Sequence, residues 1–218
     1  MIRLVYIADP MCSWCYGFGP QLSALLARVG SLRLRLVMGG LRAYNTKVMD
    51  DALKTALRGH WQHVRDASGL PFADNQLTRS DFVYDTEPPC RAVVTVREQV
   101  SERALEYFYA VQAAFYRDGR DVTQGDVLAD IASDLAMDRA AFADAWQSEA
   151  MKEATREDFA LTQRLGISGF PTVAVEHGGQ LFLVASGFTP AVVLGERIER
   201  IGAEPAARAE HTQDEASH

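Results

Sequence analysis

Hydrophobic positions near the start of the chain follow a strand pattern, then a helix pattern, then a strand pattern again. Residues 2–8 form an apolar run, rich in branched and aromatic side chains, that ends at Asp9-Pro10, which is typical of a buried strand. In residues 32–38, leucines alternate with arginines before Gly39-Gly40 ends the pattern. Between these segments, apolar side chains recur at helical spacing, at Leu22, Leu25, Leu26 and Val29. The pattern predicts a strand-helix-strand unit, which gives a parallel strand pair with a right-handed crossover.

Residues 43–150 carry a different pattern, in which one apolar stripe after another has the spacing of a helix. Asp50 is placed to cap the first of these helices, which should end near Gly69. Thr123 and Asp138 are placed to cap two later ones. Because no segment here has comparable strand character, the sequence predicts an all-helical insertion.

Strand character returns after this insertion. Residues 172–176 and 180–184 flank a His-Gly-Gly turn and predict a β-hairpin. Thr189-Pro190 then begins a last helix. Residues 205–218 are small and polar, and we expect them to form a disordered tail. The chain is thus predicted to have an α/β fold in which residues 1–42 and 151–204 build one discontinuous domain around the insertion at 43–150.

Composition and charge restrict the class of protein. Hydrophobic residues make up 48% and charged residues 23%, which are ordinary values for a globular protein. The net charge of -7 argues against nucleic acid as a partner, because phosphate binding needs clustered basic residues. No apolar run approaches the roughly 18 residues that would span a membrane. The first residues lack the basic start and long apolar stretch of a secretory signal, so we expect a cytoplasmic protein.

Two cysteines stand where the first strand gives way to the first helix, in the segment Cys12-Ser-Trp-Cys15. Two intervening residues on a helical first turn bring the sulfurs close enough to bond. The free amides and dipole of the helix N-terminus favour a thiolate at Cys12, and Cys15 should lie beneath the turn. Cys12 is therefore predicted to attack a partner disulfide, and Cys15 to resolve the mixed disulfide.

The competing interpretation of this pair is half of a zinc site. Cys90 could serve as a further ligand, and His60 and His63 lie three apart on one predicted helix face. However, the histidines are about 45 residues away and the chain has no second C-x-x-C, so we expect no metal. Cys90 itself is interpreted as a small buried apolar residue, with an activated thiol as the alternative.

A second motif, Gly166-Ile-Ser-Gly-Phe-Pro-Thr172, comes directly before the predicted hairpin. A strand, a C-x-x-C at a helix start and a distant G-[IV]-x-G-x-P-[ST] together resemble the thioredoxin superfamily. The helical insertion and the segment Asp9-Pro-Met-Cys-Ser-Trp-Cys-Tyr-Gly-Phe-Gly-Pro20 resemble its DsbA-like branch, which includes predicted cytosolic protein-disulfide isomerases. The resemblance spans nearly the whole chain and implies a thioredoxin-like fold.

The resemblance also implies roles for individual residues. Cys12 matches the family's nucleophile, Cys15 its resolving cysteine, and Pro171 its cis-proline. Phe170 matches the variable position that touches thiol and substrate, and together with Trp14, Pro171 and Thr172 it is expected to bind substrate. A buried acid found upstream of the cysteines in many relatives has no counterpart at Tyr6; the nearest acid is Asp9.

The leading functional prediction is a thiol–disulfide oxidoreductase or isomerase that acts on protein or peptide cysteines. It would need a cellular thiol reductant and no cofactor besides its own dithiol, with glutathione as an optional co-substrate. The alternative is a glutathione-dependent isomerase or kappa-type glutathione transferase that uses Cys12 alone, although Cys15 would have no role there. A third possibility is a binding or chaperone module that uses the same groove without catalysis.

Overall fold

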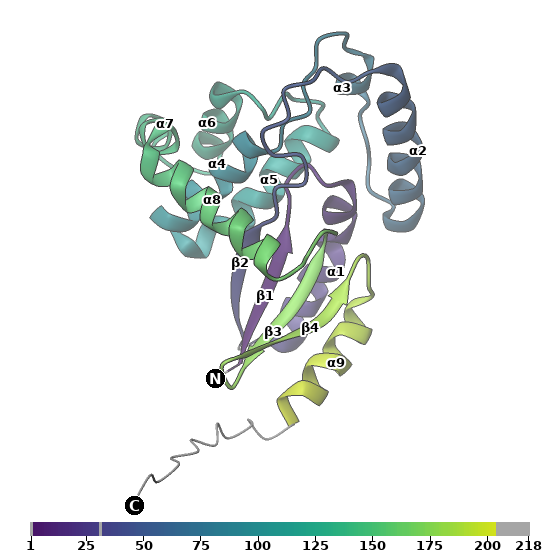
Figure 1. The fold of residues 1–218 in the computed structure, drawn as a ribbon, viewed down its shortest axis with the longest axis vertical. Helices are drawn as coiled ribbons and strands as arrows, with labels where there is room; N and C mark the ends of the chain where they lie inside the picture. Colours follow the sequence, from purple (N-terminus) through teal and green to yellow (C-terminus); the bar gives the residue numbers. More distant parts are fainter. Residues whose placement is uncertain (1, 31, 204–218) are drawn as a thin grey trace, which may run out of the picture.

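The computed structural model describes residues 2–30 and 32–203, so the predicted tail at 205–218 lies outside the described residues. The chain begins with β1 (Arg3–Ala8), α1 (Ser13–Val29) and β2 (Arg33–Met38). It ends with α8 (Glu149–Arg164), β3 (Thr172–His177), β4 (Gln180–Ser186) and α9 (Ala191–Ala203). A block of helices lies between these two halves (Figure 1). The predicted α/β fold with a helical insertion is confirmed.

The four strands form one sheet in the order β2-β1-β3-β4. β1 and β2 run parallel, as the strand-helix-strand pattern predicts, while β3 is antiparallel to both β1 and β4. The predicted hairpin is present, and its turn places Gly178 and Gly179 at positive φ. The start of β3 and the end of β1 lie side by side, with Thr172 opposite Ile7.

The alternation of side chains along β1 divides the core between two faces of the sheet. Leu4, Tyr6 and Ala8 belong to the large apolar cluster that includes α1 and α9. Val5 and Ile7 belong to a smaller cluster on the opposite face, against which Leu161 of α8 packs. Because a strand directs successive side chains to opposite faces, Tyr6 lies on the face that α1 covers.

The helical block contains six α-helices among the described residues: α2 (Asp51–Ser68), α3 (Asn75–Thr78), α4 (Glu87–Gln99), α5 (Ala104–Tyr116), α6 (Gly125–Asp134) and α7 (Arg139–Gln147). Asp50 and Asp138 cap α2 and α7 through their side chains, as predicted. The predicted Thr123 cap is wrong. α6 starts at Gly125 without a side-chain cap, because the Thr123 hydroxyl donates to Asp121 instead. The short α3 and an isolated bridge between Val48 and Val83 were not predicted.

Specific contacts fix the block against the sheet. The Arg97 guanidinium of α4 pairs with Asp158 of α8 at 2.6 Å, and the same carboxylate accepts the Met38 N–H at the end of β2. Gly17 lets α2 approach α1 closely, since a Cβ there would come within 2.5 Å of Val64. The first set of contacts ties α4 to α8 and β2, and the second ties α2 to α1.

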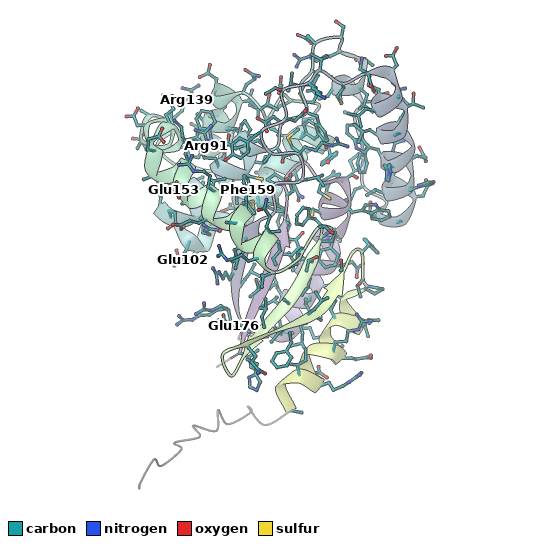
Figure 2. All side chains as sticks on the ribbon, in the orientation of Figure 1. Arg91, Glu102, Arg139, Glu153, Phe159 and Glu176 are labelled. Atoms are coloured by element: carbon teal, nitrogen blue, oxygen red, sulfur yellow. The ribbon has the colours of Figure 1, made fainter. Side chains whose placement is uncertain are left out.

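Within the block, Arg91 of α4, which is labelled in Figure 2, contacts a second helix. Its guanidinium lies 4.2 Å from the ring centroid of Trp146 in α7 and forms an ion pair with Glu87.

α8 starts at Glu149, and the division of the chain at residue 151 stays a prediction. None of the helices in the described part is long and apolar enough to cross a membrane.

Candidate active site

The cysteine pair occupies the N-terminal end of α1. Cys12 is the N-cap residue, and its carbonyl accepts the Tyr16 N–H at 3.1 Å, so the helix begins at the pair as the sequence indicates. Cys15 lies in the first turn. Both cysteines are free thiols, with 6% of Cys12 and none of Cys15 exposed. A partner can therefore reach Cys12 first, while Cys15 is covered by the rest of the turn.

The surroundings of Cys15 oppose its ionisation. Burial raises the pKa of the Cys15 thiol well above its ordinary value, and the neighbouring Cys12 sulfur and the Asp9 carboxylate raise it further. The backbone N–H of Asp9 acts in the opposite direction, because it donates toward the sulfur. Cys15 thus holds its proton in the reduced protein, which suits a resolving thiol that reacts only once Cys12 has been modified.

The loop before β3 closes the site on the other side. The Phe170–Pro171 peptide bond is cis. The Cys12 thiol donates to the Phe170 carbonyl at 3.6 Å, so two segments 158 residues apart meet at this sulfur. The Phe170 ring itself turns away and packs on Gly39, where a Cβ would come within 2.2 Å of it. The contact between residue 170 and the thiol is made by the backbone, which leaves this contact independent of the side chain at that position.

The other two predicted substrate-binding residues lie in different surroundings. Trp14 is half-buried at the rim, with its ring centroid 5.8 Å from that of Phe188. Thr172 is fully buried, and its hydroxyl donates to the Gly169 carbonyl within the loop. The structure therefore brings Cys12, Cys15 and the Phe170 carbonyl together, places Trp14 beside them, and directs the Thr172 side chain into its own loop.

Met11, the residue before Cys12, is held by hydrogen bonds on both of its backbone polar groups. The Met11 N–H donates to Asp9 Oδ1 at 2.8 Å. The Met11 carbonyl accepts hydrogen bonds from two hydroxyls of the helical block, that of Tyr116 at 2.5 Å and that of Tyr84. All three residues are buried. The block thus fixes the backbone that presents Cys12, a role of Tyr84 and Tyr116 that no sequence motif indicates.

Asp9 is a buried carboxylate surrounded by donors. Its Oδ2 accepts the Leu41 N–H at 2.7 Å and the Cys90 thiol at 3.5 Å. Burial raises the pKa of Asp9, while hydrogen bonds from Leu41, Thr86 and Met11 work against that rise. Burial also raises the pKa of Cys90 well above its ordinary value. Cys90 is thus a buried, protonated thiol on α4.

The described residues contain no group of three or more His, Cys, Asp or Glu side chains arranged to hold a metal ion. Cys90 lies against Asp9, whereas His60 and His63 are exposed on α2.

A family model for the DSBA-like thioredoxin domain matches residues 3–199. The chain belongs to this family. A candidate protein disulfide isomerase from Nitrosomonas europaea has a similar structure, with 34% identity and a TM-score of 0.85 over 91% of this chain and 96% of that one. The cytosolic disulfide reductase DsbM from Pseudomonas aeruginosa is 29% identical, with a TM-score of 0.73 over 90% of this chain and 94% of DsbM. That reductase also has a structure with GSH, which matches at 27% identity.

Among curated sequences, the ClpXP adapter protein SpxH of Halalkalibacterium halodurans is 23% identical over 176 residues. The match covers 78% of this chain and 57% of that protein, so the chain spans little more than half of this relative's length. The DSBA-like chain thus has a thiol–disulfide oxidoreductase fold, with a cysteine pair at the N-terminal end of α1.

Proposed function

We propose that this DSBA-like protein is a thiol–disulfide oxidoreductase that reduces or isomerises disulfides of proteins or peptides through Cys12 and Cys15. The supporting observation is the position of the Cys12 thiol, which is the more exposed of the pair and lies 3.6 Å from the Phe170 carbonyl. An extended substrate bound along the loop at Phe170-Pro171 would bring its disulfide to this sulfur.

The exchange proceeds in two steps that conserve atoms and electrons. The Cys12 thiolate attacks one sulfur of the substrate disulfide, forms a mixed disulfide and releases the other substrate sulfur as a thiolate. Cys15 then loses its proton and attacks Cys12, which releases the second substrate sulfur and leaves a Cys12–Cys15 disulfide. The substrate gains two electrons and the pair loses two.

A thiol reductant must return the pair to the dithiol form. Glutathione is a suitable chemical class, because two molecules reduce one disulfide and leave as glutathione disulfide. The similarity to a reductase whose structure was solved with GSH supports this choice. That relative is a cytosolic reductase, which likewise supports a reducing compartment for this protein. Ser13 and Trp14 carry no charge beside Cys12, which favours a pair more reducing than the strong oxidant DsbA at about −120 mV.

The test is insulin reduction, with the potential of the pair measured against glutathione buffers. The wild-type protein should accelerate precipitation of the insulin B chain, Cys12→Ser should abolish this activity, and Cys15→Ser should accumulate mixed disulfides. The measured potential should lie below about −120 mV by a few tens of millivolts or more. A Cys15→Ser protein that keeps full activity with glutathione would favour the glutathione-dependent isomerase or transferase instead. A Cys12→Ser/Cys15→Ser protein that still suppresses aggregation would favour a chaperone.

A further inference from the structure

Tyr6 lies in the core directly beneath the cysteine pair. It is fully buried on β1, in the same apolar cluster as Cys15. Its ring centroid lies 5.9 Å from that of Phe18 on α1 and 6.0 Å, edge-on, from that of Phe108 on α5. Ring contacts on two sides therefore fix the direction of its hydroxyl.

That hydroxyl is the unusual feature. It makes no hydrogen bond of ordinary geometry to any described residue, although it lies close enough to Cys15 to interact with that thiol, and a buried hydroxyl without such a bond costs free energy. By contrast, the buried hydroxyls of Tyr84, Tyr107 and Tyr116 each donate to a backbone carbonyl. The polar groups that face Tyr6 are Cys15 and Cys12 from α1 and Tyr109 from α5, and Cys15 acts on it most strongly.

Of the described side chains that act most strongly on Cys15, none besides Tyr6 would stabilise its thiolate. Apart from Tyr6, the ionisable groups that act on it are Cys12 and Asp9, and neither is a cation. The Asp9 carboxylate is engaged by the N–H groups of Met11 and Leu41, and its charge opposes a second negative charge nearby. The resolving step nevertheless requires Cys15 to lose its proton inside the core.

We propose that the Tyr6 hydroxyl donates a hydrogen bond to the Cys15 sulfur while that sulfur is a thiolate. This proposal rests on the dithiol exchange described above. During resolution, the Cys15 proton passes to solvent and the thiolate attacks Cys12. The bond between Cys12 and the substrate sulfur breaks, and the departing substrate thiolate takes up a proton. In the reverse direction, the same hydrogen bond stabilises Cys15 as the leaving group.

Tyr6 acts here as a neutral donor. Burial raises the pKa of its phenol well above the ordinary value, and the adjacent Cys15 raises it further, so the phenol keeps its proton throughout the exchange. Tyr6 also stands where the resemblance to the family would place a buried acid. A phenol beneath the pair can stabilise a charge on Cys15 but cannot remove its proton.

The reaction of the reduced protein with DTNB tests this proposal, because it separates the two sulfurs. Attack by Cys12 releases one thionitrobenzoate, and resolution by Cys15 releases a second. Tyr6→Phe keeps the ring and removes only the hydroxyl. It should leave the first phase within about two-fold of wild type and slow the second about ten-fold, the effect of one hydrogen bond to a charged sulfur. The midpoint of the pH profile of the second phase should move to higher pH.

Tyr107→Phe is the matched control, since it removes a buried hydroxyl that donates to Leu128 within the block. It should leave both phases unchanged. Equal slowing of both phases in Tyr6→Phe, or a second phase identical to wild type, would overturn the proposal. Should Tyr6→Phe fail to fold, a fluorotyrosine of lower pKa at position 6 should speed the second phase, and no change would overturn the proposal. If the wild-type protein gives no second phase, the proposed dithiol function itself is wrong.

Discussion

The two sides of the cysteine pair treat buried polar groups in opposite ways. On the sheet side, the Tyr6 hydroxyl is buried without a partner beneath Cys15. On the side of the helical block, the hydroxyls of Tyr84 and Tyr116 both reach the Met11 carbonyl, and the Cys90 thiol reaches Asp9. The sheet side thus contains an unpaired donor, whereas the donors on the block side form hydrogen bonds to the segment that precedes Cys12.

This difference indicates that the two sides have different roles, one in stability and the other in the chemistry of Cys15. Buried polar groups that are fully paired rigidify the segment they hold, and here that segment is the loop that presents Cys12. A buried donor left unpaired costs the resting fold free energy, and becomes useful when a charge forms beside it. Variants on the block side should therefore change stability more than the chemistry of Cys15, and Tyr6→Phe should do the reverse.

The largest loss of unfolding free energy is expected at Asp9, the carboxylate that accepts several hydrogen bonds on the block side. Asp9→Ala leaves the buried N–H groups of Met11 and Leu41 without their acceptor, and should lower the free energy of unfolding by about 2–5 kcal/mol. Asp9→Asn keeps the shape and one oxygen, so its loss should be smaller, about 1–3 kcal/mol. Urea unfolding of the reduced proteins measures both. If the Asp9 variants lost less unfolding free energy than Tyr6→Phe, the proposed difference between the two sides would be contradicted.

A comparison of wild type with Asp9→Asn by urea unfolding at several pH values gives a second test. Because burial raises the pKa of Asp9, the native state binds this proton more tightly than the unfolded chain does. The stability that this proton contributes is fully present below the ordinary pKa of Asp, and is lost as pH rises through the native pKa. The advantage of wild type over Asp9→Asn should therefore shrink as the pH rises above about 4.

The features of the two sides could be predicted from the sequence to different extents. The fold and the place of the cysteine pair follow from local patterns, because strand alternation, helix caps and C-x-x-C spacing all lie within short windows. The partners of Met11 do not, since Tyr84 and Tyr116 lie 73 and 105 residues from it and carry no motif. Tyr6 lies between these cases: its place on β1 can be predicted, but its missing partner is visible only once α1 and α5 are packed.

An intermediate loss of unfolding free energy is expected when the hydroxyl of Tyr84 or Tyr116, each of which donates to the Met11 carbonyl, is removed. Tyr84→Phe or Tyr116→Phe alone leaves one hydroxyl on the carbonyl, and should cost about 0.5–1.5 kcal/mol of unfolding free energy. The double variant leaves a buried carbonyl with no donor from these side chains, so its loss should exceed the sum of the two single losses. A double-mutant cycle by urea unfolding measures this coupling. Strict additivity would show that the two hydroxyls do not share the carbonyl.

The smallest effect is expected at Cys90. Its thiol donates one long hydrogen bond, to Asp9, so Cys90→Ala should cost only about 0.5 kcal/mol of unfolding free energy and leave insulin reduction unchanged, with Cys90→Ser as the matched polar control. Burial raises the pKa of Cys90, so the proton it holds stabilises the fold below the ordinary thiol pKa, and that stability is lost as pH rises through the native pKa. Wild type should therefore lose stability more steeply than Cys90→Ala between about pH 8 and about pH 10, while Cys15 contributes equally to both. Loss of activity in Cys90→Ala would instead place this thiol in the exchange reaction and end the separation of the two sides.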